Sequence, residues 1–332
     1  MNKHLRALLP GVPGGGDPFS YAYHLGGSYT SALLSGALLS AALFLGGSSL
    51  GHSPLTAQEA AGSPPDSALM SFQREVVQRL TGGAEISPGV TLQSRGAPED
   101  RVVVRSYLSS VLESLGLEPL RQPYREDGEN VYALLPSTTG SSEYIVVGAH
   151  FDTNSRSPGA SDNATGCAAV LGVAQHLLTL PSRERNVFLV LFDEEERGLV
   201  GSTAFAEMLV AGGMEVVAVH TIDQMGWDED GDGAIELEIP YEGAGELYRQ
   251  AATMSGFPSQ IHVTQESGSD HSAFRRQGMP AVGLTEEYRN GDTTPHIHRA
   301  TDSWDTVNFD YLARATGLFQ AAISILLGQG GG

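Results

Sequence analysis

The sequence predicts an α/β fold, a three-layer sandwich in which a mixed, mostly parallel sheet has helices on both faces. The first observation is that apolar strand-like runs alternate with amphipathic helical runs, which is the order that a parallel sheet with helical crossovers requires. The second is that 332 residues, of which 41 % are apolar and 17 % charged, can bury a substantial core.

The predicted elements follow one another regularly. Two amphipathic helices, at 67–81 and 100–116, precede a strand at 130–136. From there strands alternate with helices. The strands are at 143–149, 186–192, 215–222, 261–264 and 280–285, and the helices are at 165–180, 199–211, 245–256 and 271–278. A long loop, 286–306, leads to a closing helix that ends at residue 327.

The N-terminal part is predicted to be separate from the folded domain. Residues 31–45 form an uncharged apolar run of the length found in signal peptides, after the cationic Lys3 and Arg6. A stretch rich in Ser, Pro, Gly and Ala follows and indicates a linker. We therefore expect a signal peptide or an uncleaved membrane anchor plus linker over 1–62, and a folded domain over 63–329 that is exported, either secreted or periplasmic. A buried N-terminal helix is the alternative.

Charge and cysteine content exclude some classes of protein. The net charge is −20, with 19 Lys and Arg against 39 Asp and Glu, which argues against a nucleic-acid partner. Cys167 is the single cysteine, so no intrachain disulfide can form. Its apolar neighbours indicate a buried helix position rather than a catalytic thiol.

Potential metal ligands follow the strand at 143–149. His150 and Asp152 come at its end, and Asp162 stands in a glycine-rich loop before the next helix. Imidazole nitrogen and carboxylate oxygen are ligands that zinc prefers. Asp152 could bind metal or accept the second N–H of His150, and we favour the second role. A simple hydrogen-bonded pair at the strand end is the alternative.

Two further strand ends carry acidic residues. The run Glu194–Glu196 follows the strand at 186–192, and Asp223 follows the strand at 215–222. Because ligands bind outside the carboxyl ends of parallel strands, the three strand ends are expected to converge on one edge of the sheet. A solvated acidic turn is the alternative for the glutamates.

Together these pieces resemble a known family. The segments GAHFDT, PGASDNATG, FDEEERGLVGS, TIDQMGW, SDHSAF with GMPA, and HRATDSWD occur in the order and approximate spacing of the secreted co-catalytic dizinc aminopeptidases of the MH clan. The similarity covers roughly residues 90–325. It implies the zinc exopeptidase fold for the domain at 63–329, two zinc ions, and the N-termini of peptides or proteins as substrate.

The resemblance also implies a role for each candidate residue. Glu195 would be the general base that takes a proton from a metal-activated water. Asp162 would bridge the two zinc ions. The other implied metal ligands are His150, Glu196, Asp223 and His298. His296 is the alternative to His298, and the spacing to Asp302 favours His298.

Other functions remain open beside the exported aminopeptidase. A glutaminyl cyclase of the same clan would use one zinc. A carboxypeptidase or dipeptidase would need a cationic pocket, for which Arg275, Arg276 and Arg289 are candidates. A non-catalytic binding ectodomain is the alternative of another class.

The aspartate-rich stretch after Asp223 and the residue His271 each have more than one interpretation. Asp228, Asp230 and Asp232 alternate before Gly233, as in the first half of a calcium loop, but Ile239 occupies the twelfth position. We interpret the stretch as a solvated turn and keep calcium as a secondary hypothesis. His271 either lies near the substrate pocket or only begins a helix, whereas the pattern around His220 indicates a structural role.

Overall fold

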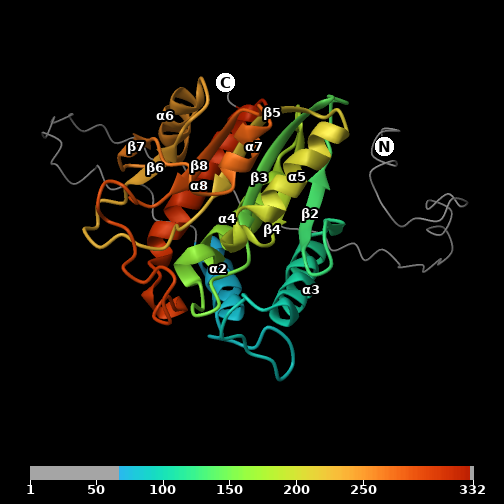
Figure 1. Ribbon diagram of the computed structural model, residues 1–332. Coiled ribbons are helices and arrows are strands. Elements are labelled where there is room, and N and C mark those ends of the chain that lie inside the picture. Colours follow the sequence, from blue (N-terminus) through green and yellow to red (C-terminus); the bar gives the residue numbers. More distant parts are fainter. Residues whose placement is uncertain (1–66, 330–332) are drawn as a thin grey trace, which may run out of the picture. The chain divides into compact units, whose positions relative to one another are not determined.

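A computed structural model describes residues 67–329, and these residues form one eight-stranded sheet with helices around it (Figure 1). The predictions for 1–62, including the apolar run at 31–45 and the boundary at residue 63, lie outside the described residues. Within 67–329, no helix is long and apolar enough to cross a membrane.

The sheet is mixed and mostly parallel, as predicted. Its strand order is β1-β2-β4-β3-β5-β8-β6-β7. The central strands β4, β3, β5 and β8 are mutually parallel, β1 and β2 add an antiparallel edge, and β6 pairs antiparallel with β8 and parallel with β7. The strands are β1 (Leu120–Pro123), β2 (Glu129–Leu135), β3 (Glu143–His150), β4 (Asn186–Phe192), β5 (Glu215–Ile222), β6 (Ile235–Glu238), β7 (Ile261–Thr264) and β8 (Ala281–Thr285).

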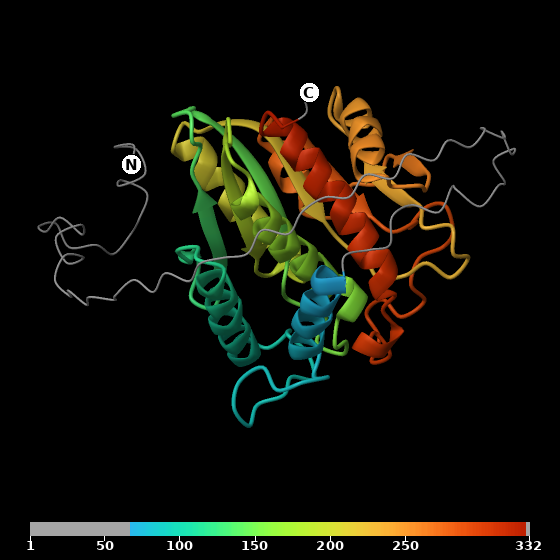
Figure 2. The ribbon, with the colours of Figure 1, turned by 180° about the vertical axis from the view of Figure 1, so that it is seen from behind.

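Helices cover both faces because alternate residues of the buried strands point to opposite sides. In β4, Val187 and Leu189 face one hydrophobic cluster, whereas Phe188 and Val190 face the other. The first cluster is covered by α2 (Ser67–Leu80), α3 (Pro98–Ser114), α4 (Thr165–Thr179), α6 (Ala244–Ser255) and α8 (Phe309–Leu326). The second is covered by α5 (Val200–Ala211) and α7 (His271–Arg276). Figure 2 shows α4 and α8 side by side over the first face.

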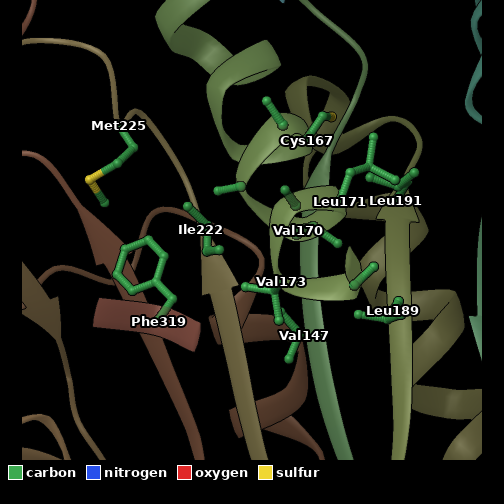
Figure 3. Packing of buried hydrophobic residues seen from close by; sticks show 14 of the residues in the cluster. Val147, Cys167, Val170, Leu171, Val173, Leu189, Leu191, Ile222, Met225 and Phe319 are labelled. Atoms are coloured by element: carbon green, nitrogen blue, oxygen red, sulfur yellow. The ribbon is translucent and has the colours of Figure 1, made fainter. Parts of the chain in front are cut away.

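Helix α4 is the central element of the first face. Its Val170, Leu171 and Val173 pack against β3, β4 and β5 (Figure 3). Cys167, on the same helix, is fully buried, and its thiol donates to the carbonyl oxygen of His150 at 3.2 Å. Burial raises the pKa of this thiol to about 12, so it is a structural residue, as expected.

Two short strands were missing from the predicted elements, namely β1 and β6. The second lies in the stretch that we interpreted as a solvated turn. Its Ile235 and Leu237 enter the first core cluster, while Glu236 and Glu238 are buried on the opposite side. The alternation of apolar and polar residues was present in the sequence, but two glutamates in four residues argue against a buried strand.

Helix α3 is tied to the end of β4 by buried ion pairs. Arg101 lies 2.8 Å from Asp193 through Nε and 2.9 Å from Glu194 through Nη2, and all three side chains are fully buried. Arg105 adds a 2.9 Å contact to Asp193. The first two acids after β4 are therefore neutralised from α3.

We expect Arg101→Met to lower the free energy of unfolding by about 3–5 kcal/mol, because it leaves buried carboxylates without their main cation. Urea denaturation measures the loss. Arg249→Met is the control, since Arg249 pairs with Glu246 on the exposed surface of α6 and should matter little. An equal effect of the two substitutions would contradict the network's structural role.

His220 gives the fold a predictable response to acid. Its ring lies 2.9 Å from the Tyr248 hydroxyl and 3.2 Å from that of Tyr241, and burial lowers its pKa to about 3. Below about pH 6.5 the unfolded chain therefore takes up a proton that the folded chain does not, and stability falls until the pH approaches the folded-state pKa. Between pH 7 and 5 we expect this residue to account for a loss of about 2 kcal/mol, measured by urea unfolding. A wild-type pH profile parallel to that of His220→Gln would contradict this assignment.

Candidate metal centre

Three parallel strands bring their carboxyl ends to one place, as expected from the sequence. In the sheet register His150 stands beside Phe192, the last residue of β4, and Asp223 directly follows β5. The Nε2 atom of His150 lies 3.3 Å from Asp223 Oδ1 and 3.4 Å from Asp162 Oδ1. These three residues form one group of potential metal ligands.

A second group shares Asp162. The Nε2 atom of His298 lies 3.1 Å from Asp162 Oδ2 and 3.1 Å from Glu196 Oε2. In each group the potential ligand atoms all lie within 4.8 Å of one another. Asp162 thus presents one carboxylate oxygen to each group, which is the arrangement of a bridging ligand between two cations.

Unsatisfied buried atoms fit the same interpretation. His150 Nε2 and Asp223 Oδ1 are buried and have no hydrogen-bond partner among the described residues, although they are 3.3 Å apart. Buried polar atoms are nearly always paired, so such a pair needs an explanation. Imidazole nitrogen with carboxylate oxygen is a donor set that suits zinc.

The electrostatics of the protein groups alone are unfavourable. Burial, with neighbouring acids, raises the pKa of Glu195 to about 10 and that of Glu196 to about 7. Burial would lower the pKa of His150, but Asp223 and Glu195 raise it well above its ordinary value. Too many carboxylates share a small buried volume, and divalent cations would offset their repulsion.

Asp152 supports this centre chiefly through the backbone. Its carboxylate accepts hydrogen bonds from the backbone N–H groups of Glu195 at 2.9 Å and Glu196 at 3.2 Å. His150 Nδ1 is nearer to the carbonyl oxygen of Asp152, at 3.1 Å, than to its carboxylate, at 3.5 Å. Asp152 therefore holds the turn that carries the two glutamates and also orients the imidazole.

Two further residues position Asp162 and were not among the predicted site residues. The carboxylate of Asp302 accepts from the backbone N–H groups of Ser161 at 2.8 Å and Asp162 at 3.2 Å. Buried Arg95 donates to backbone carbonyl oxygens of the loop that leads to Asp162, at Phe151, Pro158 and Gly159, and to Leu80 at the end of α2. No local sequence pattern marked Arg95.

Two residues close in sequence to the potential ligands, His296 and Glu194, contact other parts of the protein. His296 contacts Thr301 Oγ1 at 2.9 Å and packs against Trp227, so the structure puts His298 rather than His296 beside Asp162 and Glu196. Glu194 adopts a left-handed backbone conformation, with φ 62°, and its side chain turns to Arg101.

In the acidic loop after Asp223, the carboxylates group differently from the predicted set of Asp228, Asp230 and Asp232. Asp228 and Asp230 lie with Asp292, whereas Asp230 and Asp232 lie with Glu287. Most of these carboxylates accept backbone N–H groups of the loop itself. The donors are Gly233 to Asp228, Asp232 to Asp230, and Glu229 and Asp230 to Asp292. Asp232 similarly accepts from Ala234.

The fold is that of a zinc-exopeptidase-type α/β protein. The sequence pattern of peptidase family M28 matches residues 130–323, which is more than half of the chain. The chain belongs to peptidase family M28.

Curated relatives carry aminopeptidase names. The chain is 28 % identical over 193 residues to aminopeptidase YwaD of Bacillus subtilis, a match that covers 57 % of this chain and 42 % of YwaD. It is 24 % identical over 237 residues to a probable leucine aminopeptidase of Arthroderma otae, covering 66 % of this chain and 63 % of the relative. The chain thus spans about half of the length of these relatives.

Solved structures show the same fold. The LapA aminopeptidase of Legionella pneumophila superposes with a TM-score of 0.69 at 20 % identity, over 78 % of this chain and 72 % of LapA. A glutaminyl cyclase of Porphyromonas gingivalis superposes with a TM-score of 0.62 at 16 % identity, over 77 % of this chain and 98 % of the cyclase. Because both activities occur on this fold, the site must discriminate between them.

Proposed function

We propose that this protein is a zinc-dependent aminopeptidase that removes N-terminal residues from peptides. The observation that carries the proposal is the placement of His150 and His298 on opposite carboxylate oxygens of Asp162. Membership of family M28 and the aminopeptidase names of its relatives support it.

The geometry supports a role for each of the proposed residues. His150, Asp162 and Asp223 would hold one zinc, and Asp162, Glu196 and His298 the other. Bound zinc supplies a polarising charge that brings the pKa of water near neutrality. Asp152 and Asp302 fix the backbone of the acidic residues that surround this charge.

Glu195 is the proposed general base. It belongs to neither ligand group, yet its Oε2 lies 3.9 Å from His150 Nε2 and its side chain lines the cavity. A carboxylate beside the metal ligands, but outside both sets, is suited to accept a proton from an attacking water and to pass it to the leaving amine.

The rival activities fit the site less well. No arginine or lysine lines the cavity among the described residues, so a C-terminal carboxylate would have no cationic partner there. Arg275 instead donates to the carbonyl oxygens of Ile239 and Ala281, and Arg289 pairs with Glu266. A one-zinc cyclase would not need two ligand groups, and a non-catalytic ectodomain would not need Glu195.

Two features of the proposal lie apart from this centre. Export through a signal peptide or an anchor at 31–45 rests on the apolar run in the sequence. Calcium binding at Asp228, Asp230 and Asp232 stays a secondary prediction, because the carboxylates of this loop already accept its own backbone N–H groups.

Removal of the general base should abolish turnover without loss of metal. We expect Glu195→Gln to keep its zinc content and to lower kcat about 10²- to 10⁴-fold, because the substitution removes the proton acceptor but no proposed ligand. Hydrolysis of aminoacyl chromogenic substrates and metal analysis of the same sample test this. Near-normal turnover by the variant would eliminate the assigned base.

The second zinc can be tested with a matched pair of histidine variants. We expect His298→Ala to lower the zinc content from two ions per chain to about one, because it removes the only imidazole of the second group. His296→Ala, two residues away, should keep both ions. Equal zinc contents in the two variants would show that the ligand has been assigned wrongly.

A further inference from the structure

The cavity beside the metal centre has an unusual wall for an enzyme that would bind an apolar side chain. Its volume is about 290 Å³. Apart from the proposed base and metal ligands, it is lined by Gln224, Glu238, Glu266, Gly268, Ser269, Thr285, Tyr288 and Ile297. Ile297 is the one aliphatic side chain among them, and two of the others are carboxylates.

Glu238 is built into this wall by the sheet. It is the last residue of β6, is only 6 % exposed, and pairs in register with Gly283 of β8. A Cβ atom at position 283 would lie 2.5 Å from Glu238 Oε2, so the absence of a side chain there makes room for the carboxylate. The position of Glu238 is therefore fixed by two strands rather than by a loop.

No described residue donates a hydrogen bond to the Glu238 carboxylate. His271 Nδ1 lies 3.6 Å from Glu238 Oε2, and it has no hydrogen-bond partner within 67–329. The other ring nitrogen, Nε2, lies 3.2 Å from the carbonyl oxygen of Glu266. That contact requires the ring proton on Nε2, so a neutral His271 has no proton to offer Glu238.

Glu236, two residues earlier on the same strand, shows the contrast. Its Oε1 atom accepts from the backbone N–H groups of Arg289 and Asn290 and from the side-chain amide of Asn290, at 2.7–2.8 Å. Three internal donors thus hold one oxygen of Glu236, although its Oε2 atom has no hydrogen-bond partner among the described residues. In the described part of the chain, Glu238 lacks such donors on either oxygen and, unlike Glu236, lines the cavity. A buried carboxylate without donors is costly unless a cation pairs with it.

The surroundings of Glu238 disfavour its ionised form unless a cation lies beside it. Burial, with Asp223, Glu236 and Glu266 nearby, raises the pKa of Glu238 to about 8. Glu266 adds a second carboxylate to the wall, although Arg289 at its outer side pairs with one of its oxygens at 2.5 Å.

We propose that this cavity receives the basic side chain of an N-terminal lysine or arginine, with Glu238 as the residue that selects it. The inference rests on the proposed aminopeptidase activity and names its substrate class. An ammonium or guanidinium group would supply the donors that Glu238 lacks. An aliphatic side chain would instead leave the carboxylate desolvated and unpaired.

The test compares substrates of similar length that differ in charge. Lysyl, arginyl, norleucyl and leucyl p-nitroanilides are assayed with the zinc-loaded protein. We expect kcat/KM for lysine to exceed that for norleucine about 10- to 100-fold. Hydrolysis of norleucine at least as fast as lysine would overturn the inference and leave the aminopeptidase proposal standing, whereas hydrolysis of no substrate would contradict the proposal itself.

Two variants assign the selectivity to its residue. Glu238→Gln should lower the lysine-to-norleucine ratio of kcat/KM about 10- to 100-fold, because it removes the charge but keeps the shape. Glu242→Gln removes the same charge from the exposed loop after β6 and should keep the wild-type ratio. Equal loss for lysine and norleucine in Glu238→Gln would overturn the role, since it would indicate recognition of the α-amine common to both substrates.

Discussion

The repulsion between acidic side chains at one sheet edge is the constraint on which the rest of this structure depends. Four acids, Asp193 to Glu196, follow β4 in succession. The backbone directs them in pairs to two different places. The first two turn to Arg101 and Arg105 and are neutralised inside the protein. The last two turn toward His150 and His298. The left-handed conformation of Glu194 lies at the point where the direction changes.

The positions of the site residues are fixed largely through main-chain hydrogen bonds. Asp152 holds the amides of Glu195 and Glu196, and Asp302 holds those of Ser161 and Asp162. Carboxylates that accept two backbone N–H groups hold the main chain in one conformation, which keeps the neighbouring ligands in place. The same side-chain type therefore serves at this centre both as potential ligand and as scaffold.

Most of the fold, and the convergence of the site, could be predicted from the sequence, because both depend on local periodicity and on where parallel strands end. The spacing to Asp302 also favoured His298 over His296, as the geometry does. Strand β6 was missed because Glu236 and Glu238 are buried for reasons that lie far away in the chain, at Asn290 and in the cavity. Arg95 could not be recognised for the same reason, since its guanidinium donates to backbone carbonyl oxygens, which have no sequence signature.

That bonding pattern of Arg95 bears on how the family can diversify. Its guanidinium recognises the path of the main chain at Phe151, Pro158 and Gly159, and not the identity of the side chains there. At Ser155 and Arg156, the exposed residues between these anchor points, substitutions can accumulate without moving Asp162. Gly159 is the exception, because its φ of 69° and the 2.9 Å approach of Arg95 to a would-be Cβ leave no room for another residue. The exposed side chains of this loop can therefore change beside the metal centre while its backbone conformation stays the same.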